Sequence, residues 1–489
     1  MYSLKNKLID PVMIAQLVDQ LGLLLTPDHP LIIDSRKLTA GSIFCAYSGV
    51  ANDGRNFIPV AIQQNVAAIL WESGIDFNYD VKNFPVVNLM QAVGVLAAKQ
   101  RDYPSQNFLS IGITGTNGKT SVSHWLNQAY TVCGMSSAII GTTGAGIYPD
   151  VVDYASTTPD PITLQGLLAD FSANNIDVLA MEVSSHALHQ GRVNGINFTT
   201  AIFTNLTQDH LDYHHTMEEY YQAKSQLFYW HDLKNAVINN DDKYGERLIR
   251  ELLQDKSELT ILSYGIDSGD LRATNITQSL TGVSFTLCYK NQTQLIQAPI
   301  IGLFNVYNLL AVCGTLLVHG ISWDLLARIM SSLKPVVGRM DAQILPNKPL
   351  VVVDFAHTPD ALEKALTTLR DVRGINKLIC VFGCGGNRDK TKRPIMGEIA
   401  AALADSIIIT SDNPRDENPD DIIRDIVVGV MKDNYQIIAD RKQAIQFAIT
   451  SADSNDVILI AGKGHEDYQE IGGVKYHFSD LELVKQLLA

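Results

Sequence analysis

Short runs of apolar residues alternate along the chain with longer segments whose apolar positions recur at helical spacing. This alternation is typical of α/β proteins, in which each buried parallel strand is followed by a helix. We expect strands at residues 109–114, 178–183, 200–203, 350–354, 378–382, 406–410 and 456–461. Helices are expected from Ser121 onward and over residues 217–229. The pattern therefore predicts an α/β fold.

Polar, often glycine-rich segments follow most of the predicted strands. They lie at residues 184–186, 204–210, 356–357, 383–390, 411–415 and 462–466. Ligands of open parallel sheets bind outside the carboxyl ends of the strands. Because such segments occur in both halves of the chain, we expect two α/β domains that face each other across a cleft.

Length, charge and apolar content limit the possible classes of protein. A chain of 489 residues is too long for one hydrophobic core. We expect boundaries near residue 91 and near Gly338, and hence domains at 1–91, 92–337 and 338–489. A net charge of −14 argues against nucleic acid or an anionic membrane as a partner. No apolar run approaches the ~20 residues that cross a bilayer, so we expect no membrane insertion.

The N-terminal segment and the cysteines indicate the cellular compartment of the protein. Residues 1–25 carry polar residues at helix-like spacing, which predicts a packed amphipathic helix and not a signal peptide. The six cysteines are scattered, and Cys380 and Cys384 have neither disulfide-framework nor zinc-ribbon spacing. We therefore expect a cytoplasmic protein, and a monomer.

The segment Gly-Thr-Asn-Gly-Lys-Thr at residues 115–120 is the strongest local signal for chemistry. It joins a predicted strand to a predicted helix, so its amides and the helix N-terminus would face a phosphate. Lys119 would neutralise the β- and γ-phosphates of ATP, and the Thr120 hydroxyl would hold Mg²⁺. Gly112 lies one residue further from Gly118 than the usual spacing. The alternative is a glycine turn with a solvated lysine.

Together, these segments resemble those of the Mur ligase family, the ATP-dependent amino-acid-adding enzymes of peptidoglycan synthesis. The matching residues are 115–120, 182–186, 204–206, 209–214, 223–224, 302–308, 338–340, 354–357 and 462–466, in family order. The resemblance implies a small mixed N-terminal domain for a UDP moiety, a central parallel-sheet P-loop ATPase domain and a C-terminal Rossmann-like domain. Asp34-Ser35-Arg36, residues 385–390 and Asp412-Asn-Pro-Arg415 are most similar to members that add diaminopimelate.

The resemblance also implies a reaction. ATP would phosphorylate the D-Glu γ-carboxylate of UDP-N-acetylmuramoyl-L-alanyl-D-glutamate, and the amine of meso-2,6-diaminopimelate would attack the acyl phosphate. Negative charge gathers in both steps, which requires Mg²⁺ and fixed cations. The implied catalytic residues are Lys119, Glu182, His210 and Lys224, of which the last three would join Thr120 around Mg²⁺.

Lys224 is further implied to be carbamylated by CO₂, as N6-carboxylysine. This modification requires the free amine, and hence a pKa well below ~10.4. The alternatives are a surface lysine at 224 and a packed structural histidine at 210. His214 and His215 could suggest zinc, but packing and loop structure are the favoured interpretation.

The resemblance assigns three sets of binding residues. For ATP they are Gly115, Thr116, Asn117, Gly118, Lys119, Thr120, Ser121, Asn305, Arg339, Asp354 and His357. For the UDP-linked dipeptide they are Ile33, Ser35, Thr157, Thr158, Ser184, Gln190 and Arg192. For diaminopimelate they are Arg388, Asp412, Asn413, Pro414, Arg415, Gly462 and Glu466. For the hydroxyl residues, the alternative is ordinary capping and turn formation.

Arg415 is the residue that we expect to select diaminopimelate over lysine. Diaminopimelate differs from lysine by a distal carboxylate, which an arginine binds with two parallel hydrogen bonds. With lysine bound, a desolvated Arg415 would be unpaired, and such a site can reject the analogue by ~10⁴ or more. The alternative for this residue is a surface arginine in a turn.

Four other functions stay open: a lysine-adding ligase, a folylpolyglutamate-synthetase-like ligase, a plain P-loop kinase or NTPase, and a nucleotide-gated binding protein. Folylpolyglutamate synthetases lack the N-terminal UDP-binding segment. A kinase would explain Lys119 but not the other segments, and a binding protein would not need Glu182, His210 and Lys224 together.

Overall fold

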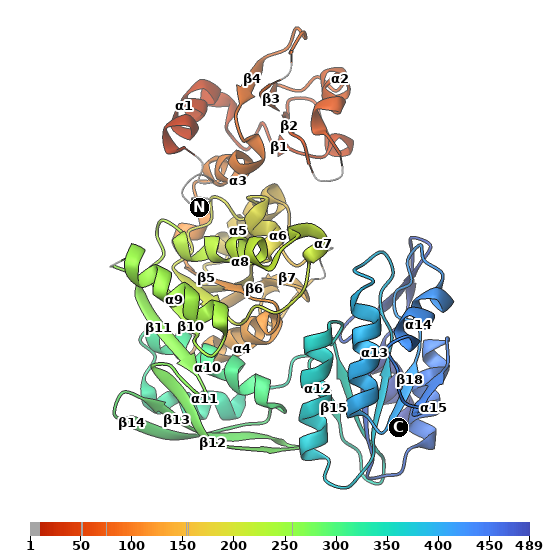
Figure 1. Ribbon diagram of the computed structural model, residues 1–489. Helices are drawn as coiled ribbons and strands as arrows, with labels where there is room; N and C mark the ends of the chain where they lie inside the picture. Colours follow the sequence, from red (N-terminus) through yellow and green to blue (C-terminus); the bar gives the residue numbers. More distant parts are fainter. Residues whose placement is uncertain (1–9, 50–51, 75, 153, 155, 257) are drawn as a thin grey trace.

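The computed structural model describes residues 10–49, 52–74, 76–152, 154, 156–256 and 258–489. Three bodies follow one another along the chain (Figure 1), each built on its own sheet. The N-terminal body stacks on the central one, and the C-terminal body lies beside the central one. In the described part of the chain, no helix combines the length and apolar character needed to cross a membrane.

The N-terminal body is a four-stranded parallel sheet with three helices. Its strands are β1 (Leu31–Ile32), β2 (Ile43–Ala46), β3 (Ala68–Glu72) and β4 (Asn83–Val86), in that order. The helices are α1 (Pro11–Leu21), α2 (Ile58–Gln63) and α3 (Leu89–Gln100). The Asp10 side chain caps α1 by accepting from the Val12 amide, and Ile14, Leu17 and Leu21 bury its apolar face. The amphipathic helix expected within residues 1–25 is therefore present as α1. Residues 1–9 lie outside the described residues.

Helix α3 links the N-terminal body to the central one. Its apolar residues from Leu89 to Ala97 pack into the N-terminal core. Gln91 Nε2 donates to the His189 carbonyl at 3.0 Å, and Gly94 leaves no room for a Cβ against the Asn194 backbone. The expected boundary after residue 91 falls inside this helix. We therefore propose to divide the chain after α3, and to keep the second division at Gly338.

The central body is a ten-stranded sheet in the order β14-β13-β12-β11-β10-β9-β5-β8-β6-β7. Strands β6 (Ser137–Gly141), β8 (Val178–Glu182), β5 (Leu109–Thr114), β9 (Thr200–Phe203), β10 (Asn235–Asn239) and β11 (Thr260–Gly265) are parallel. Strand β7 (Gly144–Ile147) pairs antiparallel at one edge. Strands β12 (Leu271–Ser279), β13 (Gly282–Tyr289) and β14 (Gln292–Ala298) form an antiparallel meander at the other.

Helices cover both faces of the central sheet. One core contains apolar residues of α4 (Lys119–Val132), α10 (Leu303–Val318) and α11 (Leu326–Ser332). The other contains those of α5 (Pro161–Ala173), α6 (Ser185–His189), α8 (Met217–Ser225) and α9 (Lys243–Asp255). The short helix α7 (Leu211–His214) precedes α8. The helix expected over 217–229 is therefore α8 followed by a 3₁₀ turn, Gln226–Tyr229.

The C-terminal body is a six-stranded sheet in the order β15-β16-β20-β17-β18-β19. Strands β16 (Leu350–Asp354), β20 (Val457–Ala461), β17 (Leu378–Phe382), β18 (Ser406–Ile409) and β19 (Tyr435–Ile437) are parallel, and β15 (Asp341–Gln343) is antiparallel. Helices α12 (Pro359–Val372), α13 (Lys392–Leu403) and α14 (Pro419–Val427) contribute to one core. Helices α15 (Arg441–Ser451) and α16 (Asp480–Leu488) contribute to the other.

The predicted α/β class and parallel sheets are confirmed. Of the seven predicted strands, β5, β9, β16 and β17 match residue for residue, and β8, β18 and β20 differ by one residue. A separate hairpin, β21 (Tyr468–Ile471) and β22 (Val474–His477), lies outside the main sheet.

Candidate active site between the central and C-terminal bodies

The glycine loop between β5 and α4 has a backbone that only glycine tolerates at two positions. Gly115 and Gly118 have φ values of +149° and +88°. A Cβ at Gly115 would collide with Thr204 Oγ1, and one at Gly118 with Asn308 Oδ1. The loop is thus held against β9 and α10, with its amides at a helix N-terminus, where an anion binds.

Asn205, directly after β9, holds the outer part of this loop. Its carbonyl accepts from the Thr116 amide at 2.9 Å, and its Oδ1 accepts from the Asn117 amide at 3.0 Å. Asn205 lies in the polar segment 204–210 that follows a predicted strand, but the sequence predicted no role for it. Its contribution is to support the loop.

Three cations gather at the loop. Lys119 Nζ donates to the carbonyls of Gly115 and Thr116, each at 2.9 Å. Lys224 Nζ donates to the same Gly115 carbonyl at 2.8 Å. From the C-terminal body, Arg339 donates to Thr120 Oγ1 at 3.0 Å. Desolvation lowers the pKa of both Lys119 and Arg339. The arrangement suits a ligand with several negative charges.

Lys224 is the most buried of the three, with 1% of its surface exposed. Its ammonium lies 4.6 Å from the centre of the Tyr220 ring, and it belongs to none of the ion pairs among the described residues. Desolvation, reinforced by the nearby charge of Lys119, moves its pKa well below the usual 10.5. The site therefore favours the neutral amine, which is the nucleophilic form.

Glu182 is a fully buried carboxylate at the end of β8. Its two oxygens accept from the amide and the hydroxyl of Thr142, at 2.9 and 3.0 Å. In the described part of the chain no arginine or lysine lies within ion-pair distance of it. A buried carboxylate without a cation is costly, so this position fits a hard divalent cation such as Mg²⁺.

His210 lies beside this region in a cluster of aromatic rings. It adopts a left-handed backbone with φ +54°, and its Nε2 is 3.3 Å from Asp209 Oδ2. Its ring centre is 4.9 Å from that of His186. Desolvation lowers the pKa of His210 to about 4 although its side chain is 46% exposed, so its ring is neutral near pH 7 and one of its nitrogens carries no proton.

The neighbouring histidines do not form a zinc site among the described residues. His214 is buried, and its Nε2 is hydrogen-bonded to Ser185 Oγ at 2.9 Å. No described group of three or more His, Cys, Asp or Glu side chains could hold a metal ion by itself. Any ion near Glu182 and His210 would need other ligands, such as hydroxyl or phosphate oxygens.

A cavity of about 510 Å³ lies between the glycine loop, α10 and the start of α12. Predicted ATP-binding residues that line it are Asn117, Gly118, Ser121, Asn305, Arg339, Asp354 and His357. Burial raises the pKa of Asp354 and lowers that of His357 to about 4. The cavity is bounded by both bodies, so a ligand in it would contact both.

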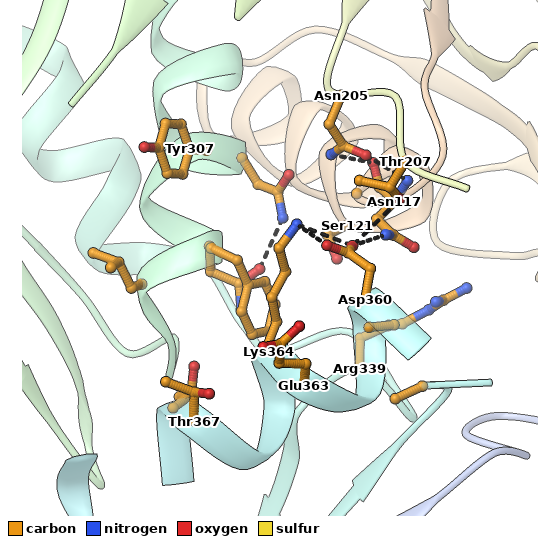
Figure 2. Close-up of a pocket in the computed structure, with 18 of the residues that line it drawn as sticks. Asn117, Ser121, Asn205, Thr207, Tyr307, Arg339, Asp360, Glu363, Lys364 and Thr367 are labelled. Atoms are coloured by element: carbon orange, nitrogen blue, oxygen red, sulfur yellow. Dashed lines mark hydrogen bonds and ion pairs between the residues drawn. The ribbon is translucent and has the colours of Figure 1, made fainter. Parts of the chain in front are cut away.

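Asp360, which was not predicted, connects the two bodies at the edge of this cavity. Its Oδ2 accepts from Asn117 Nδ2 of the glycine loop at 2.7 Å and from Lys364 Nζ at 3.0 Å. Figure 2 shows the three side chains meeting there. The loop is therefore tied directly to the first turn of α12.

Five residues predicted for the UDP-linked dipeptide form one network in the central body. Thr158 Oγ1 donates to the Glu182 carbonyl and accepts from the Ser184 amide. Arg192 donates to the Thr158 carbonyl at 3.0 Å and to Gln190 Oε1, and Thr157 Oγ1 lies 3.2 Å from Thr142 Oγ1. Ile33 and Ser35 belong to the N-terminal body, where Ile33 packs on the core and Ser35 begins a 3₁₀ turn. No described hydrogen bond joins these two to the network.

Most residues predicted for diaminopimelate gather at the carboxyl ends of β17, β18 and β20. Asn413 Nδ2 donates to Glu466 Oε2 at 2.9 Å, and Lys463 Nζ donates to both residues. Gly462 leaves no room for a Cβ against Asp412, and Gly386 none against the Pro414 carbonyl. Arg388 is exposed, with its Cγ near Gly385.

Arg415 differs from the expectation in one respect. Its Nε donates to Glu470 Oε2 at 3.1 Å, and its Nη1 donates to the Gly386 carbonyl at 2.8 Å. Arg415 therefore has a carboxylate partner within the chain, which the expectation of an arginine left unpaired beside lysine did not include. The reason is β21, which the sequence analysis did not identify.

Comparison with known proteins places the chain in a family. The profile described as "Mur ligase middle domain" matches residues 113–316. "Mur ligase, glutamate ligase domain" matches residues 338–464, and "Mur ligase family, catalytic domain" matches residues 29–101. The UDP-N-acetylmuramoyl-L-alanyl-D-glutamate–2,6-diaminopimelate ligase of Chromobacterium violaceum is 45% identical over 477 residues, which is 96% of each chain. The chain belongs to the Mur ligase family.

Solved structures agree with this assignment. A UDP-N-acetylmuramoyl-L-alanyl-D-glutamate–2,6-diaminopimelate ligase structure matches with a TM-score of 0.69 and 35% identity, covering 94% of this Mur ligase and 95% of its own chain. The folylpolyglutamate synthase of Mycobacterium tuberculosis, complexed with ADP and AMPPCP, matches with a TM-score of 0.62 and 18% identity. It covers 75% of this chain and 91% of its own, and at this identity the likeness shows the fold alone.

The burial of Lys224 leads to a prediction about stability. Between its lowered pKa and 10.5, the folded Mur ligase binds fewer protons at Lys224 than the unfolded chain, so stability rises with pH in this window. Lys224→Met removes the cost of desolvating the amine. In CO₂-depleted buffer, we expect this variant to unfold at a higher temperature than wild type at about pH 7, with a smaller gain toward about pH 10.

Lys243→Met is the matched control, because Lys243 is an exposed lysine on α9. Its effect on the melting temperature should be small and independent of pH. A Lys224→Met variant that is less stable than wild type at both pH values would contradict the account.

Proposed function

We propose that this Mur ligase joins meso-2,6-diaminopimelate to the D-Glu γ-carboxylate of UDP-N-acetylmuramoyl-L-alanyl-D-glutamate while ATP is cleaved to ADP and phosphate. The proposal is carried by the near-full-length identity to a ligase with that name, together with cations that converge on the glycine loop. We further propose that it acts as a cytoplasmic monomer without nucleic acid; all six cysteines are free.

ATP would occupy the cavity between the bodies. Gly115 and Gly118 would present amides to its phosphates, and Lys119 and Arg339 would neutralise the phosphate charge. Thr116 and Asn117, whose amides Asn205 holds, would shape the loop around them. Ser121, Asn305, Asp354 and His357 line the cavity and would contact the rest of the nucleotide. In this geometry Lys119 would exchange its loop carbonyls for phosphate oxygens.

Mg²⁺ fits the buried carboxylate of Glu182, which has no ion-pair partner among the described residues, and Thr120, His210 and modified Lys224 would be the other ligands. When bound, the ion supplies charge neutralisation for the transferred phosphoryl group. The chain itself orients Glu182 through Thr142 and keeps His210 neutral by burial. These two features make oxygen and nitrogen lone pairs available at the site.

Lys224 would become a carboxylate by reaction with CO₂. The neutral amine attacks the carbon of CO₂, a C–N bond forms, and the proton leaves to solvent. Burial and Lys119 both lower the pKa of Lys224, which favours the reactive amine. The product replaces a desolvated amine near Lys119 with an anion, so the charge of Lys119 becomes better balanced.

The acceptor would lie along the network of Thr157, Thr158, Ser184, Gln190 and Arg192, with its uridine end toward Ile33 and Ser35 of the N-terminal body. Its γ-carboxylate oxygen attacks the γ-phosphorus, ADP leaves, and an acyl phosphate forms. The amine of diaminopimelate then forms the C–N bond, the C–O bond to phosphate breaks, and the amine loses a proton.

Diaminopimelate would be held by the residues beyond β17, β18 and β20, which are Arg388, Asp412, Asn413, Pro414, Arg415, Gly462 and Glu466. Its distal carboxylate would face Arg415. These residues and the glycine loop lie on different bodies, so movement of the C-terminal body would bring the amine to the acyl phosphate.

The direct test supplies ATP, Mg²⁺ and UDP-N-acetylmuramoyl-L-alanyl-D-glutamate, and compares meso-2,6-diaminopimelate with L-lysine. We expect phosphate release and a tripeptide mass with diaminopimelate, and much lower kcat/KM with lysine, because lysine lacks the distal carboxylate. The absence of turnover with both amino acids would refute the proposal. A preference for lysine would refute only the role given to Arg415.

A pair of glycines that flank α4 tests the loop. Gly118→Ala should abolish ATP binding in calorimetry, because the new Cβ collides with Asn308 and must displace the loop. Gly134→Ala is the control, since Gly134 also has positive φ, at +78°, but nothing lies within 4 Å of its added Cβ. It should weaken stability by about 1 kcal/mol and leave ATP affinity unchanged. Equal ATP affinity in both variants would contradict this assignment.

A further inference from the structure

The hairpin of β21 and β22 packs along the segment that follows β18. Gly472 and Gly473 form its turn, with φ values of +59° and +75°. The Arg415 amide donates to the Glu470 carbonyl at 3.0 Å, and the Gly472 amide donates to the Arg415 carbonyl at 2.8 Å. The hairpin therefore holds Arg415 by both its backbone amide and its backbone carbonyl.

The remaining contacts extend this attachment to the neighbours of Arg415. The Glu470 amide donates to Asn413 Oδ1 at 3.0 Å. Gln469 Nε2 donates to the Asp412 carbonyl at 2.6 Å. Among residues 412–415, all except Pro414 are thus bonded to the hairpin, although the hairpin is not part of the main sheet.

The backbone of Arg415 needs this support. Its φ is +52°, in the left-handed region that a residue with a long side chain rarely adopts. Such a conformation persists only where surrounding contacts determine it, and it is common at ligand sites. The two backbone hydrogen bonds to β21 are those contacts, so the hairpin sets the direction in which the Arg415 side chain leaves the chain.

The side chain is fixed as well. Glu470 Oε2 accepts from Nε at 3.1 Å, and the Gly386 carbonyl accepts from Nη1 at 2.8 Å. The side chains of Arg415 and Glu470 are 20% and 26% exposed, so the pair is mostly shielded from water. A guanidinium is planar with five N–H donors, and two acceptors on different nitrogens fix its plane. The other donors can still bind a second carboxylate.

We propose that Glu470 is a positioning residue that determines amino-acid specificity by orienting the Arg415 guanidinium toward the distal carboxylate of the incoming amino acid. This inference rests on the proposed function, because it takes diaminopimelate as the ligand of Arg415. Glu470 also keeps Arg415 paired when that carboxylate is missing. It therefore lowers the penalty for lysine below the one an unpaired arginine would impose.

Two variants of nearly equal size separate orientation from packing. Glu470→Met keeps the volume and removes the acceptor, whereas Glu470→Gln keeps an oxygen that can accept from Nε. For Glu470→Met we expect KM for diaminopimelate to rise roughly 10-fold, with KM for ATP unchanged. Glu470→Gln should stay within about 3-fold of wild type. Arg415→Ala should abolish the difference between the two variants.

Glu482→Ala is the control, because Glu482 of α16 pairs with His477 of the same hairpin at an exposed position. It should leave all KM values unchanged. Equal KM for diaminopimelate in Glu470→Met and wild type would overturn the inference, as would a rise in Glu470→Met that persists in the Arg415→Ala background. Failure of the wild type to use diaminopimelate would instead refute the proposed function.

Discussion

The structure depends on the burial of basic side chains around one glycine loop. Lys119 and Lys224 donate to the same carbonyl, that of Gly115, and Arg339 reaches the Thr120 hydroxyl from another body. Like charges in a shielded site repel, and desolvation lowers the pKa of all three. In a chain with a net charge of −14, this concentration of basic side chains supports the loop as the proposed site for a polyanion. Gly115, Gly118, Asn205, Asn308 and buried Glu182 lie around these basic side chains.

The placement of these basic side chains also explains why the site needs both the central and the C-terminal body. Arg339 and Asp360 follow the boundary at Gly338, yet they bond to Thr120 and Asn117 of the central body. A nucleotide in the cavity would therefore change the contacts that hold the C-terminal body. That body also carries the residues proposed for the amino acid. In the proposed function, nucleotide binding and amino-acid placement would thus be linked through a few side chains.

The fold and the general location of the site could be predicted from the sequence because buried parallel strands are continuous apolar runs and their ligands bind at the carboxyl ends. The boundary near residue 91 was less predictable, since α3 is one uninterrupted helix that packs on both sides. Asp360 looks like an ordinary first-turn acidic residue after Thr-Pro, and only the fold places it against Asn117. Glu470 gave no signal, because a hairpin that pairs with a distant loop leaves no local pattern.

The central claim is that buried Lys224 carries a free amine that takes up CO₂. The most direct measurement is ¹³C NMR of the enzyme equilibrated with ¹³C-bicarbonate, compared with Lys224→Met. We predict one carbamate resonance in the wild type that is lost in the variant and weakens as the pH is lowered, because protonation removes the reactive amine. A wild-type spectrum without a carbamate resonance, or one that persists in Lys224→Met, would contradict the account.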